Sequence, residues 1–156
     1  MLYSIQNFLL NFAVGPAEYI GLFLFGILAT TMIPLSPEVA AVGVWKLGMP
    51  IIPTVATLLL GNYFGNVINY WVGTLGKTWI LEKYFRINPK RLRKANMWFE
   101  KYGPPILLLS WLPIIGDPLT IVPGLVKYSF KKFTIYVLMG KVIHYALIYG
   151  LSAWWI

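Results

Sequence analysis

Residues 103–126 read GPPILLLSWLPIIGDPLTIVPGLV, an apolar stretch of 24 residues that is long enough to cross a bilayer. Basic residues flank this stretch on both sides, with Lys101 before it and Lys127 after it. Because the positive-inside rule assigns both flanks to the cytoplasm, the stretch must enter and leave the membrane on the same side. Its centre, PIIGDP at 113–118, is a turn sequence. We therefore predict a re-entrant hairpin, whose broken backbone is tolerated only inside protein or against a watery cavity.

The composition indicates an integral membrane protein, because 58% of the 156 residues are apolar and only 12% are charged. A soluble domain carries about 25% charged residues. The chain has no cysteine, which excludes a disulfide framework and cysteine-ligated metals. It has one histidine and no glycine-rich phosphate loop, so we predict no metal, no cofactor and no enzyme activity. No signal-peptide pattern is present, so Met1 onward is taken as mature protein.

Two further stretches are predicted to be transmembrane helices, residues 50–76 and residues 131–156. The second ends in Trp154-Trp155, which is typical of an interfacial aromatic anchor, and it places Lys141 inside the membrane. Residues 1–14 alternate apolar and polar positions at helical spacing, which predicts an amphipathic helix in the interface.

Residues 15–47 are predicted to form a first re-entrant hairpin. Gly15-Pro16 opens the segment, and Pro34 and Pro37 interrupt it just before Glu38. Two prolines three residues apart remove two backbone donors and cannot continue a regular helix. A complete crossing by residues 17–33 remains an alternative.

The two halves of the chain resemble each other. Pro34 and Glu38 correspond to Pro113 and Asp117 at an offset of 79 residues, and GNVINY at 65–70 corresponds to GKVIHY at 140–145. With helix 50–76 running inward and helix 131–156 running outward, the halves form an inverted-topology repeat. The predicted fold is therefore a single all-α integral membrane domain, 1–156, in which each half is a re-entrant hairpin followed by a transmembrane helix.

Residues 77–102 form a basic segment, with eight of the thirteen Lys and Arg residues between positions 77 and 101. The apolar positions Leu92, Ala95, Phe99 and Tyr102 predict an amphipathic helix that lies on anionic lipid headgroups in the cytoplasmic interface. Nucleic-acid binding is the disfavoured alternative, because basic loops are normal on the cytoplasmic side of membrane proteins.

The two acidic tips are the main candidates for function. Glu38 and Asp117 are predicted near the bilayer centre, where an ionised carboxylate is costly and therefore rare without a function. Such groups could bind a proton or a cationic headgroup, or they could cap free backbone N–H groups beside the proline breaks. The remaining tip residues are Pro34, Ser36, Pro37, Pro113, Gly116 and Pro118.

The transmembrane helices contribute four further polar candidates: Lys141, His144, Asn66 and Asn69. Lys141 is predicted to pair with an acidic tip, or alternatively to reach the cytoplasmic interface from a tilted helix. His144 could equally be a packing residue, and the two asparagines could hydrogen-bond between helices. The pair Gly61-x-x-x-Gly65 suits close helix packing and also permits a homo-oligomer.

The motifs together resemble the DedA family of VTT-domain, SNARE-associated membrane proteins. The resemblance rests on Pro34-x-x-Pro37-Glu38, on the glycines and Asn66 of helix 50–76, and on Ser110–Pro118, which is most similar to the short YqaA-type branch. It covers about residues 15–150. The resemblance implies two hairpins that meet inside the membrane, and translocation of undecaprenyl phosphate or phospholipids, coupled in some relatives to the proton motive force.

The sequence departs from the family pattern at three positions. Many DedA proteins carry arginines where this chain has Ser110 and Gly116, and aspartate where it has Asn66. Because arginine binds phosphate bidentately, the absence of both arginines disfavours undecaprenyl phosphate as the substrate. Lys141 is the evident intramembrane cation that could replace them.

These observations predict a lipid translocator of the flippase or scramblase kind in a bacterial inner membrane or archaeal cell membrane. Its partners would be phospholipid or polyprenyl-phosphate headgroups. A proton-coupled carrier of a small solute and a non-transporting scaffold or assembly factor are the alternatives. The carrier would have a closed cavity, whereas a lipid path needs a groove that opens sideways.

Overall fold

The computed structural model describes residues 16–31, 44, 48–76, 78–83, 88–112 and 115–153. Within these ranges every regular element is a helix. Several predicted features lie outside the described residues: the helix 1–14, the tip residues Pro34, Ser36, Pro37, Glu38 and Pro113, and the anchor Trp154-Trp155.

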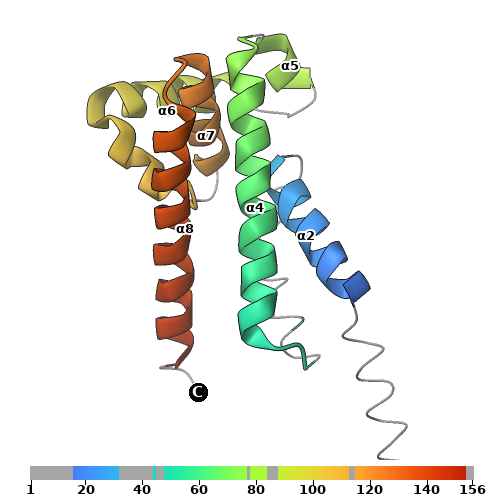
Figure 1. Cartoon of the computed structure of the whole chain (residues 1–156). Coiled ribbons are helices and arrows are strands. Elements are labelled where there is room, and N and C mark those ends of the chain that lie inside the picture. Colours follow the sequence, from blue (N-terminus) through green and yellow to red (C-terminus); the bar gives the residue numbers. More distant parts are fainter. Residues whose placement is uncertain are drawn as a thin grey trace, which may run out of the picture.

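Two long helices, α4 (Ile51–Thr74) and α8 (Phe130–Ala153), lie side by side and run in opposite directions (Figure 1). Each has 24 residues, or about 36 Å of helix, which exceeds the roughly 30 Å hydrocarbon core of a bilayer. Among the described residues, α4 is the one helix long and apolar enough to cross a membrane by length and composition. Helix α8 is as long but contains Lys131, Lys132 and Lys141.

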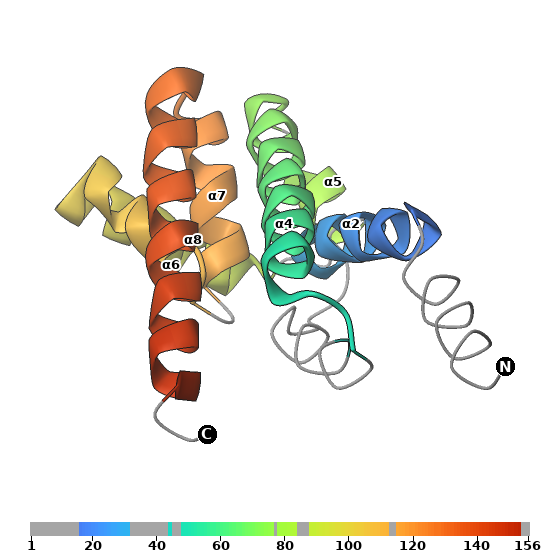
Figure 2. The same cartoon turned by 60° about the horizontal axis from the view of Figure 1, so that its bottom comes forward.

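Helix α2 (Pro16–Thr31) packs along one side of α4, while α7 (Gly116–Leu125) lies on the other side, toward α8 (Figure 2). Helices α2 and α4 approach closely because glycines line their contact. Gly26 of α2 lies against the backbone of α4, and Gly61 and Gly65 of α4 lie against α2. The predicted small-residue pair of α4 therefore packs within the chain. With 16 residues, α2 is only about 24 Å long, which is less than a bilayer core.

Residues 103–126 form a short 3-10 helix, η1 (Pro104–Leu109), and then α7 (Gly116–Leu125). Helix η1 leads away from the end of the molecule where α6 (Pro89–Tyr102) lies, and α7 returns toward that end beside α4 (Figure 1). The sequence predicted a turn over residues 113–118, but residues 116–118 are helical because α7 begins at Gly116. A proline needs no N–H partner in the first turn of a helix, so Pro118 fits there.

The basic segment contains two helices, α5 (Thr78–Lys83) and α6 (Pro89–Tyr102). Asn88 caps α6 by accepting a 2.9 Å hydrogen bond from the Lys90 N–H. The apolar face of α6 does not face lipid as predicted: Ala95 is fully buried, and Leu92 and Phe99 pack against the same core. That core consists of Ile106, Ile115, Leu119 and Val122 from η1 and the α7 region.

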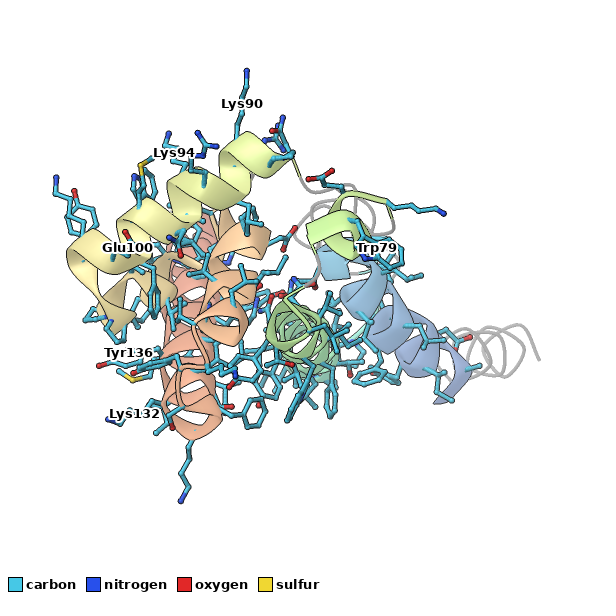
Figure 3. All side chains as sticks on the ribbon, turned by 90° about the horizontal axis from the view of Figure 1, so that it is seen from above. Trp79, Lys90, Lys94, Glu100, Lys132 and Tyr136 are labelled. Carbon is cyan, nitrogen blue, oxygen red and sulfur yellow. The ribbon has the colours of Figure 1, made fainter. Side chains whose placement is uncertain are left out.

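The sequence predicted the amphipathic helix but not this cover, because helical periodicity shows which face of a helix is apolar and not what covers that face. Of the predicted apolar stripe, Tyr102 alone is exposed. The basic side chains lie on the opposite face of α6, where Lys90 and Lys94 point away from the rest of the molecule (Figure 3).

The outward faces of the helices are strongly apolar. Large exposed hydrophobic side chains follow one another along three helices: Ile20, Leu24 and Leu28 on α2; Leu60, Phe64, Ile68 and Trp71 on α4; and Ile135, Met139, Val142, Ile143 and Leu147 on α8. An apolar surface of this extent suits contact with lipid rather than water. Polar side chains are instead buried between the helices.

Candidate functional site

A stripe of three asparagines runs along the inner face of α4. Asn62, Asn66 and Asn69 follow one another at helical spacings of four and three residues, so they share one face. Asn66 is 0% exposed and Asn69 is 1% exposed. Asn62 is half-buried. Three amides on one inward face are unusual in a helix whose outer side is apolar, because buried polar groups need partners.

Lys141 lies at the middle of α8, and its side chain is 3% exposed. Its ammonium group donates a hydrogen bond to Oδ1 of Asn62 and also interacts electrostatically with the Asp117 carboxylate. The lysine therefore points into the helix bundle, and the alternative in which it reaches the interface is not observed. A buried ammonium needs hydrogen-bond acceptors and nearby negative charge. Asn62 supplies an acceptor, and the Asp117 carboxyl group lies within electrostatic reach.

Asn69 links α2, α4 and α7. Its Nδ2 donates to the carbonyl oxygen of Thr30 at 3.3 Å and to Oγ1 of Thr120 at 3.1 Å. The Thr120 hydroxyl in turn donates to the carbonyl oxygen of Asp117 at 2.8 Å. The chain of hydrogen bonds connects the end of α2 to the first turn of α7, where Asp117 lies.

Several buried polar atoms have no hydrogen-bond partner within the described part of the chain. Among them are both side-chain atoms of the Asn66 amide, Oδ1 of Asn69 and Oγ of Ser110, while Oε2 of Glu18 lies apart from these in the first turn of α2. A buried unsatisfied polar group costs about 1–3 kcal/mol. Asn66 and Asn69 share a face of α4 with Asn62, which accepts from Lys141, and Ser110 lies against Gly116 beside Asp117.

His144 lies one helical turn beyond Lys141, and its ring stacks on Trp111 with a centroid distance of 4.5 Å and an interplanar angle of 11°. Trp111 comes from the segment that follows η1. This stacking fits the alternative in which His144 packs between elements, although the histidine remains close to the polar cluster along α8.

The second tip is held by a close backbone contact. A Cβ on Gly116 would collide with the carbonyl oxygen of Ser110, so this position requires a glycine. Gly116, Asp117 and Pro118 form the first turn of α7, and Pro118 is buried. No cluster of three or more His, Cys, Asp or Glu side chains occurs in the described ranges.

Sequence reasoning did not identify Asn62, Thr30, Thr120 or Trp111. The signal for Asn62 was present, because its spacing to Asn66 and Asn69 places all three on one face. The two threonines gave no signal, since threonine is common in apolar helices and its partner comes from another part of the chain.

The model of the VTT domain matches residues 19–153 of this chain. The chain is also 30% identical over 140 residues to the inner membrane protein YqaA of Escherichia coli, covering 86% of this chain and 93% of the relative. It belongs to the VTT-domain (DedA) family. The family resemblance and the predicted place in the cell membrane are thereby confirmed.

Two other relatives of the VTT-domain chain are informative. An uncharacterized protein of Haemophilus influenzae is 28% identical over 139 residues, covering 84% of this chain and 85% of the relative. The undecaprenyl phosphate transporter A of Bacillus subtilis is 23% identical over 88 residues, covering 54% of this chain and 44% of the transporter. No solved structure gives a significant match. The transporter name describes the Bacillus subtilis protein, of which this chain spans less than half.

Proposed function

We propose that this VTT-domain protein translocates membrane lipids, with the headgroup passing through the polar cluster while the tails stay in the bilayer. The observation that carries the proposal is the burial of Lys141 beside Asn62 and Asp117 at the middle of α8. A charged residue at that depth is rare without a function. The undecaprenyl phosphate transporter among the relatives supports a phosphate-bearing lipid as the substrate class.

The proposal includes a re-entrant second hairpin formed by η1 and α7. Both ends of this hairpin lie at the end of the molecule where α6 and the turn before α8 carry exposed cations (Figure 1). If that end faces the cytoplasm, as the positive-inside rule implies, the hairpin enters and leaves from the cytoplasmic side. Its tip, with Asp117, then lies inside the membrane.

The proposal also includes an inverted repeat, which similar glycine contacts in the two halves support. A Cβ on Gly65 of α4 would lie 3.0 Å from the carbonyl oxygen of Ile27 in α2. A Cβ on Gly140 of α8 would collide with the carbonyl oxygen of Leu108 in η1. In each half, therefore, the long helix packs through the corresponding glycine onto the first limb of the preceding hairpin.

In this mechanism Lys141 contacts the lipid phosphate in place of the arginines absent at Ser110 and Gly116. Asp117, and Glu38 in the first hairpin, bind and release protons or contact a cationic part of the headgroup. Asn66, Asn69 and His144 line the path. Proton coupling and a homo-oligomer remain predictions of the sequence.

The test is translocation in liposomes that contain the purified protein and a trace of tail-labelled fluorescent lipid, with dithionite bleaching the outer leaflet. We expect wild type to expose inner-leaflet lipid to bleaching, and Glu38→Gln to slow this by about tenfold, a barrier increase of about 1.4 kcal/mol. Glu100→Gln is the matched control, because Glu100 is exposed on α6.

Equal rates for wild type and Glu38→Gln would reject the role of the glutamate. No translocation of any lipid by wild type would reject the function and favour a scaffold or assembly factor. Uptake of a small solute without lipid movement would instead favour a proton-coupled carrier.

The exposed basic face of α6 is proposed to bind anionic lipid headgroups. We expect the combined substitution of Lys90, Arg91, Arg93 and Lys94 by glutamine to remove most of the dependence of translocation on anionic lipid content. Each basic side chain near such a surface contributes about 1 kcal/mol. The rate is measured in vesicles with and without anionic lipid, and raised salt should weaken the wild-type dependence in the same way. Identical lipid dependence in the variant would contradict this role.

A further inference from the structure

The amide of Asn66 is the most isolated polar group in the cluster. It is 0% exposed, and within the described ranges neither its oxygen nor its nitrogen has a hydrogen-bond partner. Asn69, three residues later on the same face of α4, has an unpartnered Oδ1. The orientation of Asn69 is determined, because its Nδ2 donates to the carbonyl oxygen of Thr30, which can only accept. Two acceptors and one donor group therefore lie together without partners.

The repeat explains why Asn66 lacks a partner. At the offset of 75 residues, Asn66 corresponds to Lys141, which reaches across to Asn62 of α4. The residue of α8 that corresponds to Asn62 is Val137, which is fully buried and has no polar atom. Lys141 of α8 therefore finds a polar partner on α4, whereas the corresponding place on α8 holds an apolar residue that offers Asn66 of α4 no partner.

We propose that the Asn66 amide and Oδ1 of Asn69 form a subsite for an uncharged, hydroxyl-bearing part of the lipid headgroup, such as a glycerol or sugar. This inference rests on the proposed function. An anion does not fit this subsite, because two amide oxygens would repel it. An ammonium group does not fit either, because it cannot accept from the Nδ2 donor and the nearby Lys141 charge would repel it. A hydroxyl group has one hydrogen to donate and can also accept, so two neighbouring hydroxyl groups, as in a glycerol or sugar, satisfy both amide oxygens and the Nδ2 group. The phosphate of the same headgroup would then lie toward Lys141.

The subsite is closed in this structure, because both asparagines are almost completely buried. It opens when α2 or α7 moves away from α4, since these two helices pack on either side of it (Figure 2). The unpartnered atoms raise the free energy of the closed form, and a bound hydroxyl group stabilises the open form. Such a ligand shifts the conformational equilibrium because it interacts with only one of the two states.

The experiment compares two tail-labelled phospholipids in liposomes that contain the full chain. One has a glycerol headgroup and the other a propanol headgroup, so that both carry the same phosphodiester charge and differ only in hydroxyl groups. We expect wild type to translocate the glycerol lipid about tenfold faster, as one buried hydrogen-bonded contact implies. Asn66→Leu should reduce this ratio to near one, because it slows the glycerol lipid far more than the propanol lipid. Asn96→Leu on α6, the same exchange at an amide that bonds Glu100, should keep the preference.

Equal rates for the two lipids with wild type would overturn this subsite while leaving lipid translocation intact. An unchanged preference in Asn66→Leu would also overturn it, because the amide would then serve packing or hold water alone. Wild type that moves neither lipid would overturn the proposed function and this inference together. Thermal unfolding checks the fold: removing an unpartnered amide should leave the melting temperature of Asn66→Leu unchanged or raised, and Asn66→Ala provides a second variant.

Discussion

Replacing Lys141 by methionine should unfold much of the protein or abolish its activity, the largest effect expected of any single substitution here. The variant keeps the volume of the side chain but leaves Asp117 without its counter-charge and Asn62 Oδ1 without its donor. Removing one partner of a buried charge pair typically costs about 3–5 kcal/mol. The measurement is thermal unfolding in detergent, followed by the fluorescence of the seven tryptophans, together with liposome translocation.

The double variant Lys141→Met/Asp117→Asn separates stability from function. It removes both charges, so it should recover most of the lost stability, since a buried ion pair can be replaced by uncharged groups at little cost. Translocation should nevertheless stay lost, because the phosphate contact is gone. A double variant as unstable as Lys141→Met would show that the two charges do not compensate each other.

Gly124→Ala should separate α7 from α4 and lower stability by about 1–3 kcal/mol, as overpacking of a tight core does. A Cβ at this position would collide with the carbonyl oxygen of Tyr70 and lie 2.9 Å from the Thr74 nitrogen. These are backbone atoms, so they cannot rotate away as a side chain would. Because α7 carries Asp117, the shift should also reduce translocation.

Gly21→Ala is the matched control for this prediction. Gly21 lies inside α2, and a Cβ there would meet nothing within 4 Å. Alanine is a better helix former than glycine by about 1 kcal/mol, so this variant should melt at the same or a higher temperature. Equal melting temperatures for Gly124→Ala and Gly21→Ala would contradict the tight packing of α4 on α7.

Much of the architecture could be predicted from local signals. The uncharged run before Gly76 predicted the long helix α4, and the apolar stretch after Lys132 predicted α8. These signals are strong because a long helix needs many consecutive apolar residues, which rarely occur by chance. The turn predicted at 113–118 was less accurate, because α7 begins at Gly116 and proline is compatible both with a turn and with the first turn of a helix.

The site was predicted only in part. Asp117, Lys141, Asn66 and Asn69 lie together in one cluster, but the partners Asn62, Thr30 and Thr120 were missed. Hydrogen bonds between residues 39 to 79 positions apart leave no trace in local spacing. The glycine contacts between α4 and α7 were missed for the same reason.

The sequence by itself determined that this protein belongs in a membrane, how long its helices are and which side chains are charged within them. These properties follow from composition and from the cost of placing charges in lipid, which act on each segment separately. Only the tertiary structure decided that α6 covers protein rather than lipid, that Lys141 points inward to Asn62, and that Asn66 is left without a partner. Which face of a helix meets which neighbour depends on how whole helices pack, and residues far apart in the chain set that packing jointly.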